Sequence, residues 1–99
     1  MPTHEESGSF LSDVRHLTPE QRIRFLTALR RFIDDLRAME AGERRWFRPG
    51  LRVKGVREAP GLFEMTWAPD GRATFSLGAS QKGGLRHVQW ERCGDHSIL

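Results

Sequence analysis

The residues of this chain that could do chemistry on a phosphate are its arginines and histidines. Fourteen of the 16 Lys and Arg residues are arginines, because only Lys54 and Lys82 are lysines. A guanidinium keeps its charge and its planar fork suits phosphate or carboxylate, while histidine exchanges protons near neutral pH. The net charge of +3 therefore favours an anionic partner, either nucleic acid or an acidic protein segment. An arginine-rich genome would produce the same composition, and composition alone leaves the two explanations open.

The element that must position these residues is a hairpin over Leu62 to Leu77. Hydrophobic residues alternate with polar ones on both sides of an Asp70-Gly71 pair, and this pattern favours two antiparallel strands joined by a tight turn. One face should be apolar and the other polar. Similar alternation predicts strands at Leu51 to Val56 and His87 to Arg92. The polar face of the whole sheet would then suit a polyanion, and it collects Arg52, Lys54, Glu64, Thr66, Arg72, Thr74, His87 and Gln89.

Two helices should cover the apolar face. Hydrophobic spacing predicts a short helix over Phe10 to Leu17 and a long one from Thr18 to about Met39. Thr18 and Gln21 have the spacing of a capping box, and Pro19 suits the first helical position. We therefore expect an α+β fold of two layers, with N-terminal helices on a four-stranded, mainly antiparallel sheet. Residues 1–9 should be a flexible lead-in and residues 10–99 a single domain.

The cysteine count and the hydrophobicity pattern indicate the cellular compartment. Cys93 is the only cysteine, which excludes an internal disulfide and suits a reducing compartment. We find neither a signal sequence nor an apolar run that would span a membrane, so we expect a cytoplasmic protein. Cys93 and His96 form only half of a zinc motif, so we expect no metal and no cofactor.

The chain resembles the RelE/ParE superfamily of bacterial toxins. The resemblance rests on GLFEMTWAPDGRATFSL, a following strand, and the ending Glu91-Arg92-Cys93-Gly94-Asp95-His96. That ending is similar to the Gly-Thr-His ending of the YafQ-like branch, with Asp95 in place of threonine. The resemblance covers about Phe10 to Leu99. Two departures are the absence of tyrosine, which excludes a tyrosine base, and the absence of a recognisable first strand within Met1 to Ser9.

The resemblance implies a metal-independent endoribonuclease that cleaves mRNA on the ribosome and is neutralised by a cognate antitoxin in a hetero-oligomer. His96 would be the general acid or base, and Arg72 would stabilise charge on the phosphorane. Strand alternation, rather than the family, adds His87 as a further catalytic candidate. It also places Arg52 and Lys54 on the same face, where they could hold RNA. Three further cations are expected to bind RNA, namely Arg57, Lys82 and Arg86.

Two other functions remain open at this point. A ParE-like protein would inhibit DNA gyrase without cutting RNA, and a non-catalytic relative would only bind its partner. The terminal Gly-x-His pattern favours the ribonuclease, because members that poison gyrase do not depend on such a histidine.

Overall fold

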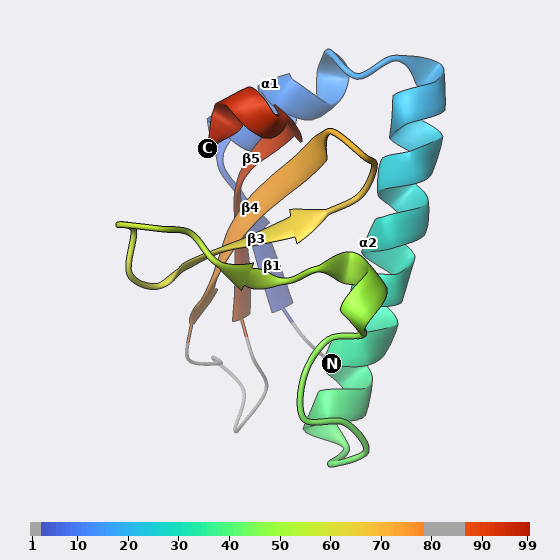
Figure 1. Cartoon of the computed structure of the whole chain (residues 1–99), viewed down its shortest axis with the longest axis vertical. Coiled ribbons are helices and arrows are strands. Elements are labelled where there is room, and N and C mark those ends of the chain that lie inside the picture. The colour runs from blue at the N-terminus through green and yellow to red at the C-terminus, as the bar shows by residue number, and fades with distance from the viewer. Residues whose placement is uncertain (1–2, 79–86) are drawn as a thin grey trace.

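The computed structural model describes residues 3–78 and 87–99, which form two helices packed on one sheet (Figure 1). The helices are α1 (Gly8–Arg15) and α2 (Pro19–Glu40). The five strands lie in the order β1-β5-β4-β3-β2. Their bounds are β1 Thr3–Glu6, β2 Lys54–Gly55, β3 Leu62–Thr66, β4 Gly71–Gly78 and β5 His87–Asp95, and short 3-10 helices lie at η1 Pro49–Leu51 and η2 His96–Ile98. The expected two-layer α+β fold is confirmed.

The first strand corrects the expected lead-in and the strand count. β1 pairs in parallel with β5, from Thr3 opposite His87 to Glu6 opposite Trp90. Ser7 then donates its backbone N–H to the Trp90 carbonyl (2.9 Å) and its hydroxyl to the Glu91 carbonyl (2.7 Å). The same hydroxyl accepts the N–H of Phe10 and begins α1. The strand is polar and is held through its backbone, so the sequence lacks the alternation that would have revealed it.

The segment before the hairpin also differs from expectation. Leu51 to Val56 was expected to be one strand, but only Lys54–Gly55 pairs with β3. Pro49 starts a 3-10 turn, Leu51 is buried at its end, and Arg52 takes a left-handed backbone with φ 48°. Proline at the first position suits such a turn because its φ is already restricted. Arg52 therefore lies ahead of the strand and outside the sheet.

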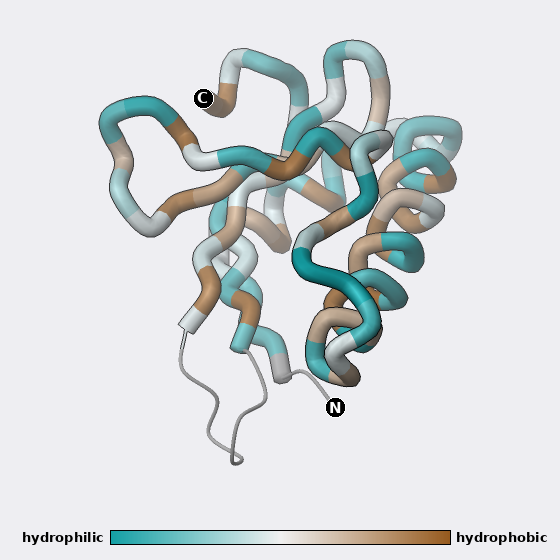
Figure 2. The backbone as a smooth tube through the Cα atoms, turned by 60° about the horizontal axis from the view of Figure 1, so that its bottom comes forward, coloured by the Kyte–Doolittle hydropathy of each residue, from teal (hydrophilic) through white to brown (hydrophobic). Residues whose placement is uncertain are grey.

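The core is aromatic and lies between α2 and the sheet. Phe32 is 1% exposed, and its ring centroid lies 4.6 Å from Phe47, 4.9 Å from Phe75 and 5.0 Å from Trp90. Hydrophobic positions recur along α2 and alternate along the strands, as Figure 2 shows. The capping box that begins α2 is present in both directions between Thr18 and Gln21. The expected packing of the helix on the hairpin is thus confirmed.

A buried carboxylate fastens the loop after α2. Asp35 is 2% exposed and accepts the backbone N–H of Arg48 at 2.9 Å and its guanidinium at 2.8 Å. These hydrogen bonds lower the pKa of Asp35 against the opposing effect of burial. They hold Arg48, and with it the neighbouring Phe47, against the C-terminal half of α2.

This pair predicts a pH dependence of stability. The pKa of Asp35 is lower in the folded state than in the unfolded state, so the unfolded state takes up a proton first as the pH falls. The stability that Asp35 contributes is therefore complete above its unfolded-state pKa and is lost as the pH falls through its folded-state pKa. Urea unfolding of Asp35→Asn should show lower stability at neutral pH and a shallower loss from about pH 5 downward. If the stability of Asp35→Asn fell as steeply with decreasing pH as that of the wild type, this role would be contradicted.

Candidate active site

The sheet face opposite the helices presents two polar rows. One row runs across four strands, from Lys54 to Glu64, Thr74 and Arg92. The next row runs from Thr66 to Arg72 and Gly94. Directly paired residues share a face, and diagonal neighbours on adjacent strands lie about 7–8 Å apart. Arg72 and Arg92 are such diagonal neighbours, so the two arginine side chains begin close together near the start of β4 and the end of β5.

Arg92 reaches this face because β5 contains a bulge. Phe75 pairs with Trp90 but Thr74 pairs with Arg92, so Glu91 is an extra residue between them. Without it, period-two alternation from Trp90 would place Arg92 on the apolar face; a bulge re-aims the residues that follow it. Our sequence reasoning missed Arg92 as a site residue for this reason. The signal was available, because two charged residues stand between buried Trp90 and buried Cys93.

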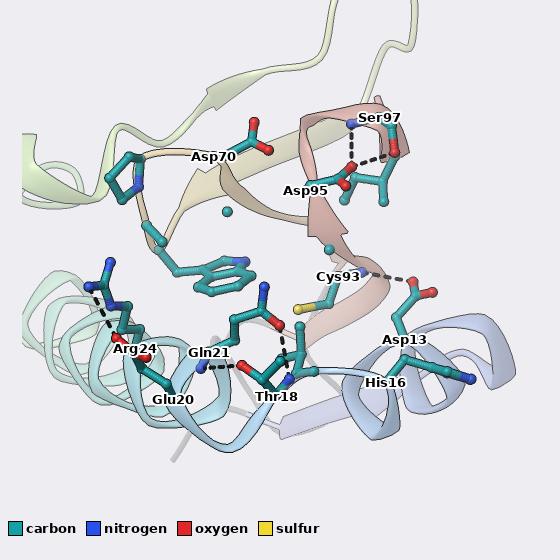
Figure 3. Close-up of a pocket in the computed structure, with 17 residues that line it drawn as sticks. Asp13, His16, Thr18, Glu20, Gln21, Arg24, Asp70, Cys93, Asp95 and Ser97 are labelled. Carbon is teal, nitrogen blue, oxygen red and sulfur yellow. Dashed lines mark hydrogen bonds and ion pairs between the residues drawn. The ribbon is translucent and has the colours of Figure 1, made fainter.

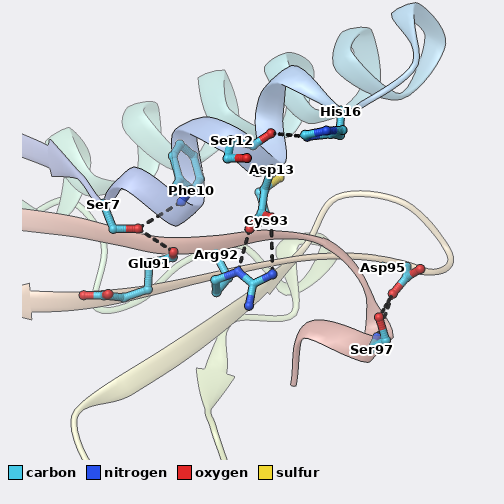
Figure 4. Close-up of polar contacts among 10 residues, drawn as sticks. All are labelled: Ser7, Phe10, Ser12, Asp13, His16, Glu91, Arg92, Cys93, Asp95 and Ser97. Carbon is cyan, nitrogen blue, oxygen red and sulfur yellow. Dashed lines mark hydrogen bonds and ion pairs between the residues drawn. The ribbon is translucent and has the colours of Figure 1, made fainter.

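Arg92 is held by α1 (Figure 4). Asp13 accepts from Arg92 Nε at 2.7 Å and from the backbone N–H of Cys93 at 3.0 Å. Burial opposes ionisation of Asp13, but these hydrogen bonds prevail and lower its pKa. The Asp13 carboxylate raises the pKa of Arg92 in return, and burial raises the pKa of the Cys93 thiol to about 12. Beyond the end of β1, Asp13 of α1 thus bonds the free backbone N–H of Cys93 at the edge of β5. The same carboxylate orients the Arg92 side chain.

Arg72 lies at the start of β4 and folds back onto the preceding turn. Its Nη1 donates to the carbonyls of Gly71 (3.0 Å), Pro69 (3.3 Å) and Ala68 (3.4 Å). The residue is half-buried. These contacts give Arg72 a structural role in the turn as well as a place beside Arg92.

The turn itself depends on a glycine. A Cβ on Gly71 would lie 2.5–2.8 Å from three ring atoms of Trp67, and that ring is buried and packed against Phe25. Since the ring cannot retreat, we expect Gly71→Ala to destabilise the protein by about 1–3 kcal/mol. Gly55→Ala is the matched control, because a Cβ there meets no atom within 4 Å. Urea unfolding compares the two, and equal stability of both variants would show that the turn adapts.

His96 lies at the same end of the sheet as Arg72. Asp95 is paired with Gly71, and η2 begins at the next residue. The Asp95 carboxylate accepts the Ser97 backbone N–H at 2.8 Å and the Ser97 hydroxyl, and these bonds lower the pKa of Asp95. The last strand therefore extends past the expected His87 to Arg92, as far as Asp95, and a capped turn follows it. The imidazole of His96 is exposed.

The structure does not bring His87 to this end. His87 pairs with Gly78, six residues along β4 from Arg72, which corresponds to about 20 Å of strand. Its Nε2 lies 3.4 Å from Glu5 Oε1 of β1. The expectation that His87 shares proton work with His96 and Arg72 is therefore at odds with the register, although the residue lies on the same face.

The other expected RNA contacts are dispersed. Lys54 lies in the first polar row, 3.7 Å from Glu64 Oε1. Arg52 is exposed ahead of β2, and Arg57 is exposed in the loop between β2 and β3. Lys82 and Arg86 lie outside the described residues.

The polar face is less open than alternation suggested. Glu64 and Thr74 were expected on the solvent-exposed face, but they are only 6% and 2% exposed. The Thr74 hydroxyl is buried and has no hydrogen-bond partner among the described residues. The longer side chains of the first row, Lys54 and Arg92, flank these two residues. The cations thus form a rim around a buried polar centre.

A cavity of about 790 Å³ lies near the same end but does not suit a phosphate (Figure 3). Four carboxylates line it, from Asp13, Glu20, Asp70 and Asp95, and only Arg24 among the lysines and arginines of the described chain does so. Neither Arg72, Arg92 nor His96 contributes to its lining. Like charge would disfavour an anionic substrate there, so we assign the site to the polar rows.

Residues 3–78 and 87–99 contain no group of three or more histidine, cysteine, aspartate or glutamate side chains that could hold a metal ion. In the same residues, neither helix is long and apolar enough to cross a membrane.

Comparison with solved structures defines the class of fold. No protein-family model matches the chain, and no curated protein sequence matches it. Its fold nevertheless matches those of toxins from toxin–antitoxin systems, with probability 1.00. The RelE/ParE-like fold expected from the sequence is therefore shown.

Three solved structures illustrate the likeness. The YafQ toxin in the E. coli DinJ–YafQ complex gives a TM-score of 0.66 at 16% identity, over 99% of this chain and 96% of that one. A YoeB/ParE toxin from Agrobacterium tumefaciens gives 0.65 at 12% identity, over 95% and 98%. A mutant toxin from Helicobacter pylori gives 0.59 at 15% identity, over 100% and 99%. At these identities the comparison establishes the fold.

Proposed function

We propose that this chain is the toxin of a type II toxin–antitoxin system and an endoribonuclease that cleaves mRNA on the ribosome. The observation that carries the proposal is the position of Arg72, Arg92 and His96 at one end of β4 and β5. The likeness to YafQ and to a YoeB/ParE toxin supports the toxin role. A cytoplasmic location and a cognate antitoxin are part of the same proposal, and the DinJ–YafQ complex supports the antitoxin.

The proposed reaction uses the message as its own nucleophile. The ribose 2′-OH attacks the neighbouring phosphorus, the bond to the 5′ oxygen breaks, and the products are a 2′,3′-cyclic phosphate and a 5′-hydroxyl. One proton leaves the 2′-OH and one reaches the departing 5′ oxygen. His96 carries out one of these transfers, because its exposed imidazole directly follows β5 at this end of the sheet.

The two arginines stabilise the negative charge that develops on the phosphorane. Arg72 and Arg92 approach from adjacent strands, and guanidinium groups match phosphate oxygens in geometry. Asp13 positions Arg92 through the 2.7 Å hydrogen bond and does not touch the substrate. Lys54, Arg52 and Arg57 provide outlying positive charge for the RNA backbone, and the same role is proposed for Lys82 and Arg86. His87 is left with RNA binding rather than proton transfer.

Induced expression tests the proposal. The wild type should arrest growth, and primer extension on cellular messages should reveal new 5′ ends within minutes of induction. Growth arrest with intact messages and relaxed DNA would instead identify a gyrase inhibitor. Normal growth with intact messages would identify a non-catalytic binding module.

A further inference from the structure

The segment between α2 and β2, green in Figure 1, carries an aromatic ring that the proposed reaction does not use. Trp46 is 40% exposed, whereas the other two tryptophans, Trp67 and Trp90, are 8% and 4% exposed. Phe47, the next residue, is buried and stacks on Phe32 of α2. Phe47 therefore fills the core at this point, and the Trp46 ring is left at the surface.

The Trp46 ring is held in one orientation. Its Nε1 donates to the Val53 carbonyl at 3.4 Å, and its ring centroid lies 5.3 Å from that of Phe47 and 5.9 Å from that of Phe63. Arg44 Nε donates to the Trp46 carbonyl at 3.1 Å and fastens the backbone at the same place. A planar ring that is both oriented and accessible loses little conformational entropy when another planar group stacks on it.

Positive charge is concentrated around this ring. Residues 44–57 contain no aspartate or glutamate and six cations, namely Arg44, Arg45, Arg48, Arg52, Lys54 and Arg57. Three of them, Arg45, Arg52 and Arg57, are exposed and form no ion pair with any carboxylate in the described part of the chain. Arg45 is the chain neighbour of Trp46, and Arg52 precedes the residue whose carbonyl binds the indole. Unpaired positive charge thus adjoins an accessible ring.

This combination fits an unpaired nucleotide better than it fits an acidic peptide. A nucleobase stacks on an aromatic side chain through its π-face, and arginines match the phosphates on either side of it. The carboxylates of a peptide would pair with the same arginines but would leave the Trp46 ring without a planar partner. Double-stranded RNA keeps its bases stacked within the helix, so it offers the ring nothing to stack on.

The path from the ring to the polar rows indicates which RNA strand it contacts. Lys54 belongs to the same basic segment as Trp46 and begins the first polar row, which continues through Glu64 and Thr74 to Arg92. Three strand spacings, about 14 Å in all, separate Lys54 from Arg92. A single strand whose phosphate lies at Arg92 therefore needs only a few nucleotides to reach the basic segment.

We propose that Trp46 is a base-stacking site for single-stranded RNA, where it holds an unpaired nucleotide of the message a short way along the strand from the cleaved bond. Arg45 and Arg52 contact the flanking phosphates. The inference rests on the proposed function for the identity of the strand, and it adds a contact with a base to contacts with the backbone. Because every base can stack, the site raises affinity for the message without selecting its sequence.

Fluorescence titration tests the stacking without cleavage. The probe is a single strand of about ten nucleotides whose 2′-O-methyl riboses lack the attacking hydroxyl. Trp67 and Trp90 are buried, so quenching of tryptophan emission reports mainly on Trp46. The strand should quench this emission. An abasic strand of the same length and charge should quench less and bind at least about fivefold more weakly.

Matched variants make the test specific, with affinity measured by the anisotropy of a dye-labelled strand. Trp46→Leu should weaken the base-carrying strand at least about fivefold and the abasic strand by less than about twofold. Trp46→Phe keeps a planar ring and should recover part of the lost affinity. Arg45→Ala should weaken both strands alike and make binding less dependent on salt. Ile23→Ala, an exposed apolar change on α2, should leave both affinities unchanged.

Four results would overturn the proposal. They are equal affinity of the wild type for the two strands, no binding of either strand, an unaffected Trp46→Leu variant, and a polyglutamate peptide that binds as tightly as the base-carrying strand. The last result would show that the surface fits an acidic protein. Loss of ribosome binding by Trp46→Leu with unchanged affinity for the strand would also overturn it, because ribosomal RNA would then be the occupant.

These outcomes are separate from the ribonuclease test. A protein that binds the strand through Trp46 but cleaves no message would keep the stacking site and lose the proposed reaction. Message cleavage by a protein that binds both strands equally would give the reverse result.

Discussion

Replacing His96 with alanine should lower the rate of message cleavage by about 10²–10⁴-fold, because the variant loses a positioned proton-transfer group. The fold should be unaffected, since the imidazole is exposed and η2 is capped by Asp95 rather than by His96. The measurement is single-turnover cleavage of a defined message on purified ribosomes. A variant that cleaves as fast as the wild type would remove His96 from the mechanism.

Arg72→Ala should lower the same rate by about 10²–10³-fold, which is the usual effect of losing one donor to transition-state charge. Because Arg72 also contacts three turn carbonyls, its unfolding must be measured beside its activity. Arg72→Lys separates the two roles in part. It keeps the positive charge but loses the planar guanidinium, so its cleavage rate should lie between those of Arg72→Ala and the wild type. Arg30→Ala, an exposed change on α2, is the control and should cleave normally.

The largest expected loss of stability comes from Phe32→Ala. Phe32 contacts rings from the loop, β4 and β5 at centroid distances of 4.6–5.0 Å, so its removal leaves a cavity where the two layers meet. Such truncations cost about 3–5 kcal/mol, and a domain of this kind has only about 5–15 kcal/mol in total. Urea unfolding monitored by circular dichroism provides the measurement.

Ile23→Ala is the matched control for Phe32. It lies on the same helix but is 66% exposed, so the change should alter stability by less than about 0.5 kcal/mol. A loss below about 1 kcal/mol for Phe32→Ala would contradict the packing described above.

The parts of the fold that sequence patterns predicted are those held by buried side chains. The hairpin alternation placed Met65 and Phe75 in the core, and the hydrophobic stripe of α2 placed Phe32 and Leu36 opposite them. The capping residues Thr18 and Gln21 located the start of α2 to within one residue. In each case burial or a local cap decides the structure, and both leave a periodic signature.

The parts that were missed depend on the backbone or on irregularity. β1 is fastened by backbone pairing to β5, which any polar sequence could adopt. The bulge at Glu91 shifts the alternation of β5 by one residue and so moves Arg92 into the candidate site. Register also separates His87 from Arg72, although alternation correctly placed both on one face. Alternation specifies a face, but only strand pairing specifies a position along it.

The chemical identity of the cleaved ends tests the central claim most directly. Wild-type protein incubated with ribosomes and a defined message should produce fragments that end in a 2′,3′-cyclic phosphate and begin with a 5′-hydroxyl, and His96→Ala should produce almost none. An intact message, or fragments that begin with a 5′-phosphate in place of the 5′-hydroxyl, would contradict the reaction proposed for Arg72, Arg92 and His96.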